Sequence, residues 1–99
     1  MNRLDRDYVH LIFDRAVVEA IKATHKFPQP NKVLLKVAEE AGEVVKAGVH
    51  LSENRDFTWH DLEDECIQTI AMCLRLLTEG DQTIGLKVRH NQPPAIGGA

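Results

Sequence analysis

The fold is decided by residues 31–52, which read NKVLLKVAEEAGEVVKAGVHLS. Apolar residues recur in this stretch three and four positions apart, which places them on one face of an α-helix. They are Val33, Leu34, Val37, Ala41, Val44, Val45, Gly48 and Leu51. We therefore expect a helix over residues 32–51, with Asn31 as its N-cap, because an asparagine side chain accepts hydrogen bonds from the first turn.

Two further segments with helical spacing flank this stretch. Upstream, residues 5–24 repeat with a spacing of three and four, marked by Leu4, Tyr8, Leu11, Ile12, Arg15, Ala16 and Glu19. Pro28 and Pro30 then end that helix. Downstream, Thr58 can cap a third helix, with Asp61 three positions later in a capping-box arrangement. That helix should continue to about residue 77 and bury Leu62, Cys66, Ile70, Cys73, Leu74 and Leu77.

Three helices with short connections predict an all-α, antiparallel helical bundle. The spacing weakens after Gly80, where residues 83–89 fit a short fourth helix or an extended segment. Residues 1–90 are expected to form a single helical domain, and residues 91–99 a flexible C-terminal tail. The apolar faces of the second and third helices are wider than one partner helix needs. We therefore expect oligomerisation to complete the bundle.

Composition excludes several classes of partner and compartment. The 99 residues carry a net charge of -3, which argues against general attraction to nucleic acid. No apolar run approaches the length of a membrane span, and the polar start lacks the features of a signal peptide. Cys66 and Cys73 lie two helical turns apart, too far for a disulfide, and fit core thiols in a reducing compartment. The sequence predicts a cytoplasmic protein without a membrane partner.

Acidic residues hold matching positions on the second and third helices. At roughly 100° per residue, Glu40 borders the apolar face and Glu43 lies about 60° further round. Glu65 and Gln68 repeat this placement on the third helix. Packing through the apolar faces can bring these oxygen atoms together. Converging carboxylates repel one another unless a cation neutralises them, and Mg²⁺ prefers oxygen ligands. This pattern favours a metal site suited to phosphoanhydride chemistry.

A simpler interpretation places the same acids on a solvated helix face. Lys36 lies four residues before Glu40, and Lys46 is close to Glu43. Ion pairs at such spacings stabilise exposed helices without any ligand. Spacing alone leaves both interpretations open.

Two stretches of the chain resemble a known family. Residues 36–44, KVAEEAGEV, match the Glu-Glu-x-x-Glu motif of the MazG-like, all-α nucleoside triphosphate pyrophosphohydrolases. Residues 62–68, LEDECIQ, stand where that family carries a Glu-x-x-Asp motif. The resemblance covers roughly residues 33–77. It implies hydrolysis of a nucleoside or deoxynucleoside triphosphate to the monophosphate and pyrophosphate. It also implies Mg²⁺ as cofactor, with Mn²⁺ as an alternative, and a homodimer or homotetramer.

The resemblance also assigns roles to individual residues. The implied metal ligands are Glu40, Glu43, Glu65 and Gln68. Glu40 and Glu39 are the implied catalytic residues, and Glu39 would ligate metal or orient the attacking water. Lys36 would bind a phosphate of the substrate.

Gln68 departs from the family pattern, which has an aspartate at this position. An amide oxygen can ligate Mg²⁺, but it brings no charge and cannot act as a general base. A second hypothesis is therefore a catalytically impaired relative, a helical oligomer that binds nucleotide or protein. A third is a structural bundle whose acids are all solvated.

Overall fold

The computed structural model describes residues 4–88, which form three α-helices and one short 3-10 helix. In chain order these are α1 (Arg6–Lys26), α2 (Val33–Ser52), α3 (Trp59–Glu79) and η1 (Gln82–Ile84). The described residues contain no strand, only an isolated bridge between Asp81 and Leu86. The predicted all-α fold is confirmed. The predicted tail, residues 91–99, lies outside the described residues.

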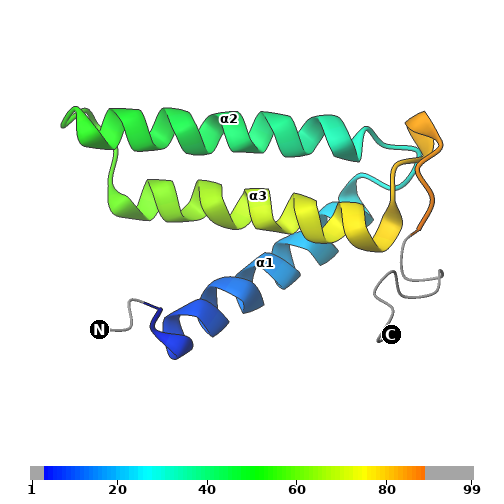
Figure 1. Ribbon diagram of the computed structural model, residues 1–99, viewed down its shortest axis with the longest axis horizontal. Coiled ribbons are helices and arrows are strands. Elements are labelled where there is room, and N and C mark those ends of the chain that lie inside the picture. The colour runs from blue at the N-terminus through cyan, green and yellow to red at the C-terminus, as the bar shows by residue number, and fades with distance from the viewer. Residues whose placement is uncertain (1–3, 89–99) are drawn as a thin grey trace, which may run out of the picture.

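Helix α3 lies between the other two helices (Figure 1). It packs against α2 along most of its length and runs in the opposite direction, while α1 crosses it obliquely. In the described part of the chain α1 and α2 make no close backbone approach to each other. Helices α1 and α2 therefore both pack against α3.

Local sequence signals set the start of α1 and both ends of α3. Asp5 caps α1 by accepting a hydrogen bond from the Tyr8 amide at 3.1 Å. At the start of α3, Thr58 and Asp61 form the predicted capping box, with reciprocal bonds of 3.2 and 2.7 Å. Gly80 ends α3 with a φ of 71°, and a Cβ there would lie 2.2 Å from the Leu86 carbonyl oxygen. Only glycine fits this position.

The start of α2 is capped from a distant part of the chain. The sequence predicted Asn31 as its N-cap, and this prediction is wrong. Lys32 holds that position and makes no side-chain capping bond. The cap comes from Asp81, whose carboxylate accepts a hydrogen bond from the Leu34 amide at 3.0 Å. Asp81 is only 1% exposed and also accepts a bond from the Thr83 amide at 2.9 Å. Asp81 therefore fastens the segment after α3 to the first turn of α2.

The core is built from small and medium apolar side chains and contains one buried arginine. The buried apolar residues are Ala16, Val33, Ala47, Ile67, Ala71 and Met72. Arg75 is 1% exposed, and its Nε donates to Glu79 at 2.9 Å. Its Nη2 donates to the Phe27 carbonyl, which joins α3 to the connection between α1 and α2. Leu77 was expected in the core but is 59% exposed, because this end of α3 turns Arg75 inward instead.

The two cysteines are not joined by a disulfide. Cys66 and Cys73 are free thiols, as expected, although both are half-buried and neither belongs to the fully buried core. Over residues 4–88, none of the helices has the combination of length and apolar character needed to cross a bilayer.

Replacing Asp81 with alanine should destabilise the fold. The substitution leaves the first turn of α2 uncapped and removes a negative charge from the positive end of its helix dipole. We expect the melting temperature to fall by roughly 5 °C. Asp56→Ala, an exposed change in the connection between α2 and α3, should leave it unchanged. Equal melting temperatures for the two variants would contradict the capping role of Asp81.

Candidate metal site

Glu65, in the second turn of α3, is influenced by the charges of two acids of α2. Partial burial raises the pKa of its carboxyl group, and the negative charges of Glu40 and Glu43 raise it further. Asp64 adds to this effect, whereas Lys46 opposes it. Glu40 and Glu43 therefore lie near enough for their charges to act on Glu65, but the ligand atoms of these three residues do not all lie within 4.8 Å of one another.

No basic side chain pairs with these acids. Within residues 4–88, the ion pairs include none of Glu39, Glu40, Glu43 and Glu65. The ammonium group of Lys36 lies over the ring of Phe27, 4.9 Å from its centroid. The lysine pairs expected for a merely solvated helix face are therefore not formed. Lys46 opposes the effect of the two acids on Glu65 without forming an ion pair with it.

Gln68 faces α1 and shares a pocket with Glu65. Its side-chain nitrogen donates a hydrogen bond to the Glu19 carboxylate at 2.8 Å. The pocket has a volume of about 540 Å³ and is lined by Asp14, Arg15, Val18, Glu19, Asp64, Glu65, Ile67 and Gln68. Glu65 thus borders this pocket and also approaches the acids of α2. Neither Glu40 nor Glu43 lines this pocket, so the structure does not place Gln68 beside the acids of α2.

Glu39 and Lys36 lie in a different part of the surface. They line a pocket of about 390 Å³ at the N-terminal end of α2, together with Pro30, Asn31, Lys32, Leu35 and Thr83. Neither residue borders the pocket of Glu65 and Gln68. The structure therefore does not bring these two predicted site residues together with the acidic group.

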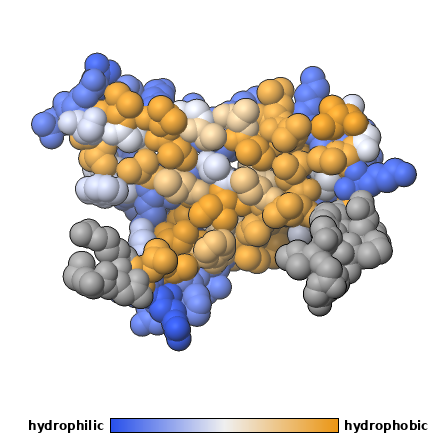
Figure 2. All heavy atoms as spheres, in the orientation of Figure 1, coloured by the Kyte–Doolittle hydropathy of each residue, from blue (hydrophilic) through white to orange (hydrophobic). Residues whose placement is uncertain are grey.

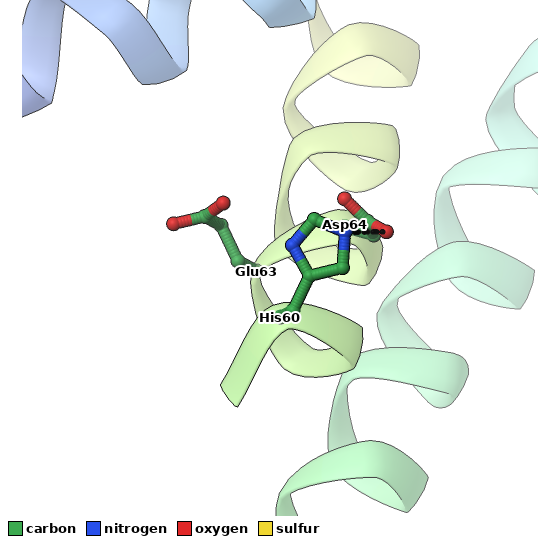
Figure 3. A group of neighbouring side chains, drawn as sticks. All are labelled: His60, Glu63 and Asp64. Carbon is green, nitrogen blue, oxygen red and sulfur yellow. Dashed lines mark ion pairs between the residues drawn. The ribbon is translucent and has the colours of Figure 1, made fainter. Parts of the chain in front are cut away.

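A second set of potential ligands, absent from the sequence predictions, lies one turn earlier on α3. His60, Glu63 and Asp64 have ligand atoms within 4.8 Å of one another. In Figure 3 the His60 ring lies beside Asp64, with 3.4 Å between its Nε2 and the Oδ2 of Asp64. The Glu63 carboxylate points to the other side of the ring. Arg15 pairs with both carboxylates at 2.9 Å, and Tyr8 donates to Glu63 at 2.6 Å. Arg15 brings one positive charge to these two carboxylates, so its ion pairs offset part of their negative charge.

The sequence predicted no site role for Arg15 and Glu19, although their positions in α1 indicated that each needs a polar partner. Both residues fall within the helical spacing of the apolar face of α1, where a charged residue needs a partner on a neighbouring helix. The structure supplies those partners on α3. The hydrogen bond from Gln68 lowers the pKa of the Glu19 carboxyl group, and the bond from Lys22 adds to this effect.

Comparisons with known proteins do not identify the chain. No protein-family model matches it, nor does any curated protein or any solved structure.

Glu65→Gln should stabilise the metal-free protein at neutral pH. Because folding raises the pKa of Glu65, its ionised form costs stability at pH 7. That cost disappears once the pH falls below the ordinary glutamate pKa of 4.5. In the presence of a chelator, we expect the melting temperature of the variant to exceed that of the wild type by a few degrees at pH 7. The gain should vanish at pH 4.

The control for this experiment is Glu39→Gln, which removes an exposed acid from the same motif. It should change the melting temperature little at either pH. A gain for Glu65→Gln that persists at pH 4 would show that packing, and not charge repulsion, is responsible.

Proposed function

We propose that this chain is a Mg²⁺-dependent nucleoside triphosphate pyrophosphohydrolase of the MazG-like kind. It would cleave a nucleoside or deoxynucleoside triphosphate to the monophosphate and pyrophosphate. The observation that supports the proposal is that Glu40 and Glu43 of α2 lie near enough to Glu65 of α3 to raise the pKa of its carboxyl group, while no ion pair within residues 4–88 involves any of the three. These acids are also the residues on which the resemblance in sequence depends.

The donor atoms available here fit a hard divalent cation. Mg²⁺ binds carboxylate and carbonyl oxygens and keeps several positions for water and phosphate. In the proposal Glu40, Glu43 and Glu65 hold the ion, and the amide oxygen of Gln68 is a further ligand. The bound ion would polarise a phosphoryl oxygen and lower the pKa of a bound water. Mn²⁺ has similar ligand preferences and is the alternative metal.

Two residues nearer the N-terminal end of α2, which line a pocket apart from that of Glu65, have roles implied by the resemblance in sequence. Lys36 would bind a substrate phosphate, for which its ammonium group must move off the Phe27 ring. Glu39 would ligate metal or orient the attacking water. Because both line the pocket that also contains Lys32, the triphosphate would extend along α2 towards this end of the helix.

Gln68 favours a second candidate function. Without a carboxylate at this position the site has one acid fewer than the family motif, which weakens metal binding and removes a possible base. The alternative is a catalytically impaired relative that binds nucleotide or protein as a helical oligomer. The two functions differ in whether the protein hydrolyses a nucleoside triphosphate, so an assay of pyrophosphate release distinguishes them.

The proposed assembly is a homodimer or homotetramer. Many large apolar side chains stay exposed in the single chain, and Figure 2 shows apolar residues spread across one face of the molecule. Those more than half exposed include Leu11, Ile21, Leu35, Val45, Trp59, Leu77 and Ile84. Exposed apolar surface of this kind is typical of a protein interface. We place the protein in the cytoplasm, where reducing conditions keep Cys66 and Cys73 free.

The enzymatic proposal predicts release of pyrophosphate from at least one common NTP or dNTP in the presence of Mg²⁺ or Mn²⁺. Glu40→Gln should reduce kcat by on the order of 10²-fold or more, because it removes a charge that holds the metal. Gln68→Asp should raise the activity by restoring the missing carboxylate. Asp56→Ala, an exposed change in the connection between α2 and α3, serves as the control and should keep wild-type activity.

The assay needs a second readout, the change in melting temperature on addition of metal. Absence of turnover with every substrate, together with no rise in melting temperature, would reject the enzymatic proposal. Metal binding without turnover would favour the impaired relative.

Light scattering coupled to size-exclusion chromatography should give the mass of two or four chains. Ile21→Glu places a charge among the exposed apolar residues of α1 and should shift the mass towards a single chain. His10→Glu, at an exposed polar position of the same helix, should not. A monomeric wild-type protein would contradict the proposed assembly.

A further inference from the structure

Helix α2 has an apolar face that the rest of the described chain leaves largely exposed. The helix lies at one edge of the molecule, and within residues 4–88 α3 is the only helix that packs against it (Figure 1). Five exposed residues, spaced alternately three and four positions apart, form one stripe along the helix. We call this stripe the outer face of α2; it consists of Leu35, Ala38, Gly42, Val45 and Val49. An exposed apolar stripe at this spacing is typical of helices that pair side by side.

Gly42 has no packing role within the single chain. A Cβ atom at this position would meet nothing within 4 Å beyond the backbone of its own helix, so the fold does not require glycine here. Glycine inside a helix lowers the stability of that helix relative to alanine. The missing side chain lets another helix approach closely, and Ala38, one turn earlier, extends this narrow region. The outer face therefore has the shape of a surface that receives a second helix.

The small residues and the valines of the outer face lie in different halves of α2. Ala38 and Gly42 belong to the N-terminal half, where a groove of about 450 Å³ is lined by Ala38 and Ile84 among others. Val45 and Val49 belong to the C-terminal half and are 64% and 46% exposed. When two copies of α2 run in opposite directions, Val49 of each copy faces Ala38 of the other, and Val45 faces Gly42. In a parallel pair each small residue would face its own copy and leave a gap.

Charged residues beside the outer face favour the same orientation. Lys32, Glu39, Lys46 and Glu53 recur every seven residues along one flank, with alternating sign. In an antiparallel pair with two-fold symmetry, this flank meets the same flank of the other copy in reverse order. Glu39 then faces Lys46, and Lys32 faces Glu53. Every charge on the flank therefore meets its opposite.

The central charges of this flank have no ion pair of their own. Within residues 4–88, none of the ion pairs includes Glu39 or Lys46, and both side chains are exposed. Glu53 already pairs with Arg55 at 3.0 Å, so the contact between Glu39 and Lys46, which occurs twice in a symmetric dimer, matters most. In a parallel pair the charged flank would meet the opposite flank, which is uncharged. That flank consists of Leu34, Ala41 and Gly48.

We propose that the outer face of α2 binds the same face of a second copy of this chain, antiparallel, with Glu39 of each copy beside Lys46 of the other. This inference rests on the assembly named in the proposed function, but on neither its metal nor its reaction. It gives Glu39 a partner outside its own chain. A contact of Glu39 with metal or water would therefore require that ion pair to open.

Cross-linking tests the pairing and its direction. The two positions changed in Ala38→Cys/Val49→Cys lie roughly 16 Å apart along one helix, too far for a disulfide within the chain. In the antiparallel pair each introduced thiol lies beside the other introduced thiol of the second copy. Mild oxidation should therefore convert most of this variant to a covalent dimer on a non-reducing gel.

The single variants Ala38→Cys and Val49→Cys are the matched controls. In an antiparallel pair the two copies of either thiol lie roughly 16 Å apart, so neither variant should cross-link. They also report any link made through Cys66 or Cys73. Absence of a covalent dimer for the double variant overturns the proposal. Equal cross-linking of a single variant also overturns it, since a parallel pair gives that result.

A charge exchange tests the ion pair between Glu39 and Lys46. Lys46→Glu places two acids side by side at both ends of the two-fold axis and should weaken dimerisation by roughly 10-fold, measured by analytical ultracentrifugation. Glu39→Lys/Lys46→Glu restores opposite charges and should return the affinity to near the wild-type value. Lys87→Glu makes the same change of charge at an exposed position outside α2 and is the control. Equal affinities for Lys46→Glu and Lys87→Glu would contradict the pairing.

The outcomes separate this inference from the proposed function. Cross-linking of the double variant alone supports the interface even if the wild type releases no pyrophosphate. A wild-type dimer whose double variant does not cross-link overturns this interface and leaves the enzymatic proposal in place. A monomeric wild-type protein overturns the interface as well.

Discussion

Helix α3 connects the other two helices, which make no close backbone approach to each other within residues 4–88. The position of α1 relative to α2 is therefore set by α3 and by the segment of residues 27–32 that joins the two helices. Polar contacts with α1 occur along the length of α3, at Glu63, Gln68 and Glu79. Glu65 lines a pocket against α1 and is also near enough to Glu40 and Glu43 of α2 for their charges to raise the pKa of its carboxyl group. A site with contributions from all three helices can form only on α3, because it alone touches both neighbours.

In the described residues, the arginines of α1 and α3 pair with acids that join the helices and not with the candidate metal ligands. Arg15 pairs with two adjacent acids of α3, and the buried Arg75 pairs with Glu79. Each of these pairs neutralises charge where two elements meet. No arginine or lysine pairs with Glu65 or its two acidic neighbours on α2, although the described chain places basic residues on all three helices. Repulsion left in place lowers the stability of the metal-free fold, and a cation would relieve it.

Sequence signals predicted those features that depend on neighbouring residues. Apolar spacing gave the three helices to within about two residues of the observed ends, and the capping box at Thr58 formed as expected. The cap of α2 was missed because Asp81 lies 47 residues from the amide it binds. Burial of Arg75 was missed for a similar reason, since its partner Phe27 belongs to a distant connection. The spacing of apolar residues predicts which face of a helix is apolar. It does not predict which distant polar group will cap the helix or bond to a buried side chain.

The hydrogen bond between Gln68 and Glu19 shows what an aspartate at position 68 would change in this bundle. The Gln68 amide nitrogen donates to the Glu19 carboxylate at 2.8 Å and so joins α3 to α1. A carboxylate at position 68 could only accept hydrogen bonds and would repel the Glu19 carboxylate. An aspartate is also one methylene shorter than glutamine, so it would stand further from Glu19. The glutamine that departs from the family motif therefore contributes a contact between two helices that an aspartate could not make.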